Sequence, residues 1–117
     1  MSRSKRLLYD VLLDGGADGP HILRGPLLRD LEAYQVLALC VLRDFSPGGV
    51  SLSFGWAALP GVIGGVGSGS LTGAPAIVQQ FLPFVIHQGT PEVALVTIAG
   101  GPLTDGQLEL VLESVDL

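Results

Sequence analysis

The stretch GVIGGVGSGSLTGAP, residues 61–75, contains six glycines and is the part of the sequence most suggestive of chemistry. Backbone N–H groups of such a stretch can cradle a phosphate when a strand precedes it and a helix follows. The dinucleotide fingerprint Gly-x-Gly-x-x-Gly fails here, because the third glycine after Gly67 and Gly69 comes one place late, at Gly73. A P-loop needs a lysine, and the only one in the chain is Lys5. We therefore expect a long glycine-rich loop within one domain, which is uncommon and usually functional.

The other side chains that could do chemistry are few and isolated. His21 and His87 belong to no recognisable nucleophile or metal-binding motif. Cys40 lies among leucine and valine residues, which favours a buried and inert thiol. Asp14 and Asp18 flank two glycines and could offer oxygen ligands to calcium, but an exposed turn is the commoner structure for such a sequence. We expect no catalytic residue, no metal and no cofactor.

Charge is sparse and unevenly placed along the chain. Only 15% of the residues are charged, 48% are hydrophobic, and the net charge is −5. Soluble domains average about 25% charged residues, so the shortfall predicts apolar surface that a symmetric partner covers. Arg3, Lys5 and Arg6 are half of the basic residues, and we expect residues 1–6 to be a solvated basic tail. The remaining acidic body argues against a nucleic-acid partner, except through those three side chains.

The segment from Phe45 to Pro91 contains no Asp, Glu, Lys or Arg. Glycines and prolines interrupt this segment too often for a membrane span. Behind the basic N-terminus, Tyr9, Asp10 and Asp14 break any apolar signal core. We therefore expect a protein that is made and used without secretion by a signal peptide.

Short runs of β-branched, leucine and aromatic residues alternate with glycine and proline turns along the chain. In VSLSFGW (50–56) and QLELVLE (107–113), apolar and polar residues alternate, as in strands with one face in a core. The expected core residues are Val50, Leu52, Phe54, Trp56, Leu108, Leu110 and Leu112. The alternation then slips, and a β-bulge near Ser114 would explain the slip. The seven or eight such runs predict an all-β fold, a single antiparallel β-sandwich that is jelly-roll-like, over residues 7–117.

Three consecutive segments predict how the strands connect. RGPLLRDLEAYQVL (24–37) has leucines near helical spacing, so a short helix and an extended strand are both open there. QVLALCVL (35–42) is apolar on both faces, which predicts a central strand whose second face meets another layer or subunit. RDFSPGG (43–49) is a turn that we expect to join two antiparallel strands.

Two groups of side chains are candidates for binding. The first is an assembly interface, because the stretch 61–75 combines glycine flexibility with apolar residues that suit packing against a neighbouring subunit. Its candidates are Val62, Ile63, Val66, Leu71, Phe81 and Phe84. The second is a ligand site for sugar stacking at Tyr34, Trp56 and His87, although Trp56 shares the apolar face of its strand and core packing suits it better.

Four segments carry a resemblance to a known family: GPHILRGPLLRDLEAYQVLALCVLRD, GGVSLSFGW, FLPFVIHQGTPEVALVTIAGG and GQLELVLESVDL. Their order resembles small β-sandwich domains of the galactose-binding, discoidin-like kind that occur in tailed-phage virion proteins. Sugar-binding members of that family usually present arginine, asparagine or aromatic residues on loops at one end. This chain has no asparagine, so the resemblance implies assembly more than sugar binding.

We therefore expect a non-catalytic structural protein that self-associates and docks on a larger particle. The most concrete form is a phage virion component, such as a capsid decoration, head or tail protein. Its expected partners are itself and other subunits of the assembly, without a membrane, and its expected location is the virion or the cytoplasm of a bacterial host. The alternative function is a carbohydrate-binding β-sandwich module.

Overall fold

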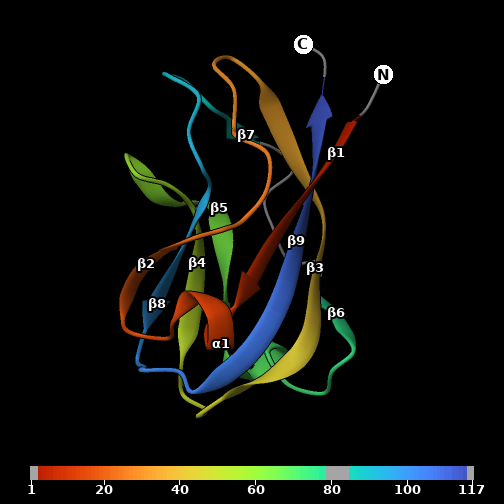
Figure 1. The fold of residues 1–117 in the computed structure, drawn as a ribbon. Coiled ribbons are helices and arrows are strands. Elements are labelled where there is room, and N and C mark those ends of the chain that lie inside the picture. The colour runs from red at the N-terminus through yellow and green to blue at the C-terminus, as the bar shows by residue number, and fades with distance from the viewer. Residues whose placement is uncertain (1–2, 79–84, 116–117) are drawn as a thin grey trace.

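The computed structural model describes residues 3–78 and 85–115, which form a sandwich of two antiparallel sheets (Figure 1). The first sheet has the order β1 (Arg3–Asp10), β9 (Asp105–Val115), β3 (Ala33–Ser46) and β6 (Ala76–Val78), and the two-residue β7 (Val85–Ile86) also pairs with β3. The second sheet has the order β2 (Gly19–Ile22), β8 (Leu95–Ala99), β4 (Ser51–Trp56) and β5 (Leu59–Gly67). The predicted all-β sandwich is confirmed.

The chain passes repeatedly from one sheet to the other, from β1 to β2, from β3 to β4 and from β8 to β9. Two facing sheets connected in this way form a jelly roll, as the sequence predicts. The turn at residues 43–49 is therefore not a hairpin. It joins β3 to β4 across the sandwich, so the expected pairing of the strands on either side of it is wrong.

The hydrophobic core lies between the two sheets. All seven residues predicted to face inward are at most 2% exposed. They lie in β4, in β9 and, for Val50, immediately before β4. Their alternation with serine, glycine and glutamate explains why, since period-two patterning turns every second side chain toward the facing sheet.

β3 is a central strand, as predicted, but its apolar outer positions have a specific cause. The register between β3 and β9 shifts at three places along β3, and Leu37 and Leu42 each lie at one of these shifts. Such β-bulges interrupt the alternation of a strand, and both leucines are exposed, at 39% and 46%. The bulge predicted near Ser114 is wrong, because the pairing of β1 with β9 runs unbroken to Ser114.

The predicted basic tail over residues 1–6 is also wrong for the part that the structure describes. β1 begins at Arg3 and pairs with the end of β9, with Arg3 opposite Ser114. Alternation of Lys5, Leu7 and Tyr9 on one face allows this strand to cover the core despite its charge, because the aliphatic stem of a lysine can lie along apolar surface.

The short helix considered for residues 24–37 does not form. In this segment Arg24 forms a β-bridge with Leu8, and Leu28 forms one with Glu92, before β3 begins. A single turn of helix, α1 (Val11–Asp14), lies instead directly after β1. The Asp10 carboxylate caps it by accepting a hydrogen bond from the N–H of Leu12 at 2.9 Å. Among the described residues, no helix is long and apolar enough to cross a membrane.

The expected loop over residues 61–75 is mostly regular structure. Its first half belongs to β5, which pairs with β4 up to Gly67, and a 3₁₀ turn (Ser68–Ser70) follows. The remainder is held against the sandwich, because the carbonyl of Leu71 accepts a hydrogen bond from the N–H of Phe45 at 2.9 Å. The Asp44 carboxylate also accepts one from the N–H of Ala74 at 2.7 Å.

Candidate functional site

The predicted ligand residues Tyr34, Trp56 and His87 lie at the end of the sandwich where β3 begins and β4 ends. The ring centroids of Trp56 and His87 are 5.0 Å apart in an edge-to-face arrangement. The backbone of Arg29 connects Tyr34 to His87. Its N–H donates to the Tyr34 hydroxyl at 2.8 Å, and its carbonyl lies 2.9 Å from His87 Nδ1. The structure thus brings all three residues into one cluster.

This cluster is part of the core and not a surface platform. Tyr34, Trp56 and His87 are all buried, with His87 completely so. An aromatic ring stacks on a sugar only if one of its faces is open, and none of these three rings offers such a face. The cluster's role in this structure is to pack and hydrogen-bond the end of the sandwich.

His87 is the most constrained member of the cluster. Its Nδ1 faces the Arg29 carbonyl, and its Nε2 lies 2.8 Å from the Glu92 carboxylate, which also accepts from the N–H of Ala57. Both nitrogens of the buried ring therefore have a polar partner in the protein. These bonds tie the connections before β3, before β8 and after β4 to each other.

A pocket of about 500 Å³ lies beside Arg29. Its lining residues come from β1, the β2–β3 connection and the β7–β8 connection, and they are Lys5, Pro26, Leu27, Arg29 and Pro91. The backbones of Leu28 and Glu92 exchange two hydrogen bonds, of 2.7 and 3.1 Å, which fix the two connections relative to each other. The sequence contains no motif that would reveal this pocket, because its residues are far apart along the chain.

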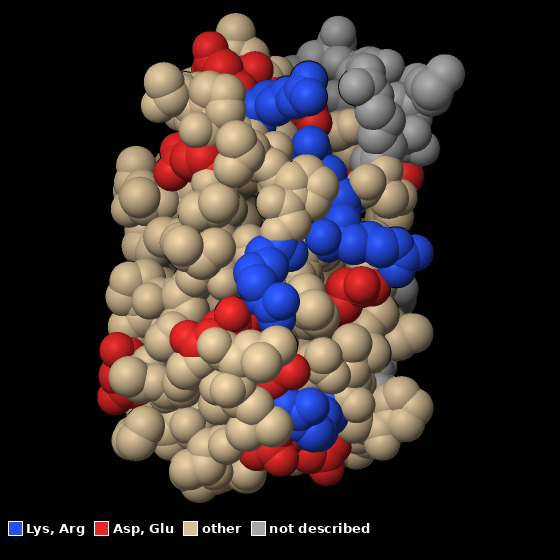
Figure 2. All heavy atoms as spheres, in the orientation of Figure 1, with Lys and Arg blue, Asp and Glu red and all other residues tan. Residues whose placement is uncertain are grey.

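Basic side chains follow the length of β1. Figure 2 shows Lys and Arg in a band along this face, with Asp and Glu beside them. Lys5 and Arg6 belong to β1, Arg24 exchanges backbone hydrogen bonds with Leu8, and Arg43 contacts Asp10 at the end of the strand. Each of the four has a carboxylate within 4 Å.

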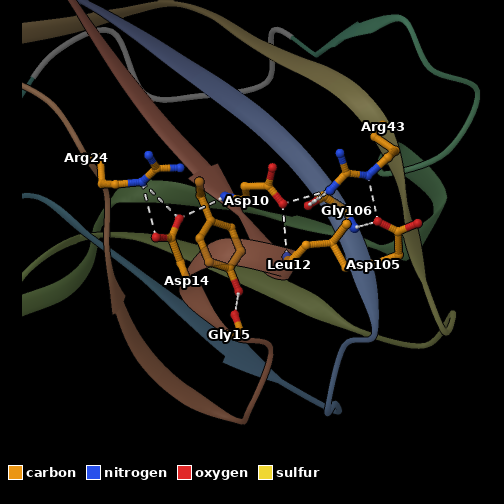
Figure 3. A network of polar contacts seen from close by, with 9 residues as sticks. Asp10, Leu12, Asp14, Gly15, Arg24, Arg43, Asp105 and Gly106 are labelled. Atoms are coloured by element: carbon orange, nitrogen blue, oxygen red, sulfur yellow. Dashed lines mark hydrogen bonds and ion pairs between the residues drawn. The ribbon is translucent and has the colours of Figure 1, made fainter.

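The densest of these polar contacts is at the end of β1 (Figure 3). Arg43 lies between two carboxylates and donates to Asp10 at 2.7 Å and to Asp105 at 2.6 Å. The hydrogen bond from Arg43, together with one from the N–H of Gly106, holds the pKa of Asp105 below its usual range. Asp14 forms an ion pair with Arg24 at 3.1 Å, so its carboxylate contacts another basic residue of the band along β1.

None of these groups forms a recognisable catalytic set. Asp18, which could have been a calcium ligand with Asp14, instead accepts a hydrogen bond from the N–H of Gly101 at 2.7 Å. No group of three or more His, Cys, Asp or Glu side chains suited to a metal ion occurs within residues 3–78 and 85–115. The polar contacts around α1 and Arg43 join loops to strands and can be accounted for as structure.

The two tyrosines of the chain provide a spectroscopic test of this packing. Burial raises the pKa of Tyr9 to about 12, with the Asp14 and Asp10 charges adding to the effect, and burial likewise raises that of Tyr34 to about 12. An unfolded tyrosine ionises near pH 10. The folded state therefore binds these protons more tightly, and its stability should fall as the pH rises from about 10 through 12.

An absorbance titration of phenolate formation should show both tyrosines ionising near pH 12 in the native protein and near pH 10 in denaturant. A native-state midpoint at pH 10 for either residue would contradict its burial. Circular dichroism on the same samples separates local ionisation from unfolding.

The predicted assembly residues are placed differently from expectation. Ile63, Val66 and Leu71 are buried in the protein's own core, at 2%, 7% and 1% exposure, and the half-buried Val62 packs against it. Their apolar character is thus used within the sandwich, by residues of β5 and by Leu71 after the 3₁₀ turn. The other two candidates, Phe81 and Phe84, lie outside the described residues.

The pattern of side chains in the sequence does not show how the backbone of β5 is hydrogen-bonded. The strand is nine residues long, stands at the end of the order β2-β8-β4-β5, and pairs only with β4. On its other side it accepts or donates no backbone hydrogen bond to any residue that the structure describes. It carries no charged side chain, and four of its nine residues are glycine.

No protein-family model, curated protein or solved structure gives a significant match to this chain.

Proposed function

We propose that this chain is a non-catalytic structural protein that self-associates and docks on a larger particle. The observation that carries the proposal is the outer edge of β5, which pairs with no strand among the residues that the structure describes. An edge strand presents a row of unpaired N–H and C=O groups, and proteins usually protect such edges by charge, proline, bulges or short length. β5 has Pro60 and a register shift against β4 in its first half, but residues 64–67 pair regularly with β4 and carry no charge, proline or bulge.

The other three sheet edges are better protected. β1 carries Lys5 and Arg6, and its free side is bridged to Arg24. β2 has four residues, including Pro20, and β6 has three. The contrast singles out β5 as the edge along which another strand can be added.

A second copy of this chain is the occupant that suits the edge best. Two β5 strands can pair antiparallel about a two-fold axis, which makes a self-complementary interface and one continuous sheet across the dimer. Like charges opposite one another would oppose such pairing, but residues 45–91 carry none. The glycines of β5 leave little side-chain bulk at the contact.

The larger particle is most concretely a bacteriophage virion, in which this chain would be a capsid decoration, head or tail component. The support is an analogy at the level of fold, since jelly rolls build many viral capsid proteins, together with the resemblance to discoidin-like domains of tailed-phage virion proteins. Exposed Leu37, Leu42 and Ile77 on β3 and β6 provide apolar surface for contact with other subunits. The location would then be the virion or the cytoplasm of the bacterial host.

The proposal predicts the effect of adding charge to the edge. At Gly61 and Gly67 an added Cβ meets no atom closer than 4.0 Å, so lysine fits at both positions. The double variant Gly61→Lys with Gly67→Lys should weaken self-association by about tenfold or more, because like charges meet across the two-fold axis. Sedimentation equilibrium measures the change.

Gly48→Lys is a matched control, since it adds the same charge at an open position in the turn between β3 and β4. It should leave self-association unchanged. A wild-type chain that is monomeric at micromolar concentration, or a dimer that the β5 lysines do not weaken, would refute pairing through this edge. Co-sedimentation with the native particle tests the docking step separately.

A further inference from the structure

We infer that the pocket lined by Lys5, Pro26, Leu27, Arg29 and Pro91 is a binding site for a small organic carboxylate with an apolar body. This inference is independent of self-association, because the pocket lies beside β1 and β5 is in the other sheet. Its volume of about 500 Å³ falls within the range of about 300–1,000 Å³ that is usual for small-molecule sites.

The cation at one side of the pocket, the Lys5 ammonium, has no hydrogen-bond acceptor among the described residues. The Lys5 side chain is only 13% exposed, and its ammonium lies 3.8 Å from a Glu32 carboxylate oxygen and 5.9 Å from the centre of the Tyr34 ring. Both separations are beyond hydrogen-bonding distance, and Nζ donates no hydrogen bond to the described residues. An ammonium has three N–H groups to donate, so an anion in the pocket can satisfy what the protein does not.

The second cation is Arg29, whose backbone is fixed while its side chain makes no ion pair with the described residues. The backbone of Arg29 is fixed on both sides, by Tyr34 through its N–H and by His87 through its carbonyl. Its exposed guanidinium has no carboxylate partner within the described part of the chain. Arginine binds carboxylates in a bidentate manner, with two parallel N–H···O bonds.

Two of the nearby acids form hydrogen bonds with groups other than the two cations. Asp30 accepts a hydrogen bond from the N–H of Gly89, and Glu92 is engaged by His87 and Ala57. Among the described residues, Glu32 is the one carboxylate within 4 Å of either cation, and it contacts Lys5 and not the Arg29 guanidinium.

The rest of the lining determines what the anion is attached to. Two prolines and a leucine offer no hydrogen-bonding side chain, so they favour an apolar group next to the carboxylate. Their positions are fixed, because the paired backbones of Leu28 and Glu92 lie directly beside Leu27, Arg29 and Pro91. The pocket therefore selects for a carboxylate on a ring or a branched chain, with the acid group toward Lys5 and Arg29.

Benzoate is a suitable probe, with benzyl alcohol and acetate as comparisons. In amide-detected NMR titrations, benzoate should shift the signals of residues 27–29 with a dissociation constant of about 1 mM. Benzyl alcohol lacks the charge and acetate lacks the apolar body, so each should bind about tenfold more weakly. Arg29→Gln and Lys5→Met should each weaken benzoate binding by about tenfold.

Arg6→Gln is the matched control, because it removes a positive charge from the residue next to Lys5 on β1, whose side chain is paired with Glu109. It should leave the benzoate dissociation constant unchanged. Arg29 is exposed, so Arg29→Gln should keep the native spectrum and the test does not depend on Lys5→Met folding. No benzoate shifts at residues 27–29, equal binding of benzyl alcohol, or equal losses in Arg29→Gln and Arg6→Gln would each overturn the assignment.

Discussion

Replacing Phe54 by alanine should lower the free energy of unfolding by about 3–5 kcal/mol, the usual cost of emptying a buried aromatic site. Phe54 is fully buried in β4, the strand that stands between β8 and β5. The small side chain would leave a cavity between the sheets that the paired strands on both sides cannot close. Urea denaturation followed by tryptophan fluorescence measures the change, since Trp56 is the only tryptophan.

Ile77→Ala is the control for this experiment, because Ile77 is 68% exposed on β6. Its effect should stay within about 0.5 kcal/mol, as for an ordinary surface change. A loss below about 1 kcal/mol for Phe54→Ala would mean that the inward face of β4 is assigned backwards.

Gly16→Ala should destabilise the protein by about 3 kcal/mol, at the upper end for inserting an atom into a packed site. An added Cβ at Gly16 would lie 2.0 Å from the carbonyl oxygen of Leu103, which is backbone and cannot rotate away. Moving the segment would break the hydrogen bond of 2.7 Å from the N–H of Leu103 to the Gly16 carbonyl and displace the buried Leu103 side chain. Thermal unfolding by calorimetry measures the loss.

Gly48→Ala supplies the comparison, since an added Cβ there meets no atom within 4 Å. It should change the free energy of unfolding by no more than about 0.5 kcal/mol. If the two alanine variants are equally stable, the β1–β2 and β8–β9 connections do not pack as closely as described.

The strands with one buried face could be predicted from the sequence because an apolar residue next to a polar one shows which side of the strand faces the core. Leu52 beside Ser53, and Leu110 beside Glu109, indicate which side is the core without any knowledge of the neighbouring strands. Strand order is a different matter. A turn such as 43–49 has the same glycine and proline chemistry whether it returns along the same sheet or crosses to the other.

Bulges and the edges of the sheets could not be predicted from the sequence either, because both depend on the neighbouring strands. Leu37 and Leu42 look like core residues in the sequence, since only the register with β9 shows that each lies at a register shift. The apolar residues of 61–75 were assigned to contact with a neighbouring subunit, whereas they pack in this chain's own core, because the sequence does not distinguish one's own core from a partner's. The outer edge of β5 is defined by the lack of a pairing strand among the described residues, which no local pattern reports.

The pocket could not be predicted because it is assembled from three distant segments. Lys5 looked like part of a solvated tail, and Arg29 lay in a segment that could have been helical. Only the pairing of β1 with β9 and of Leu28 with Glu92 brings them together.

The position of β9 has a consequence for how the chain folds as it is synthesised. β9 is the last of the nine strands in sequence order, yet it lies between β1 and β3 in the first sheet (Figure 1). Until residues 105–115 have left the ribosome, β1 lacks the strand with which it pairs along its whole length, and the uncharged strands β4 and β5 have no complete facing layer. The nascent chain must therefore remain largely unfolded with its apolar middle exposed, and folding becomes possible only when the final strand enters between the two that were made long before it.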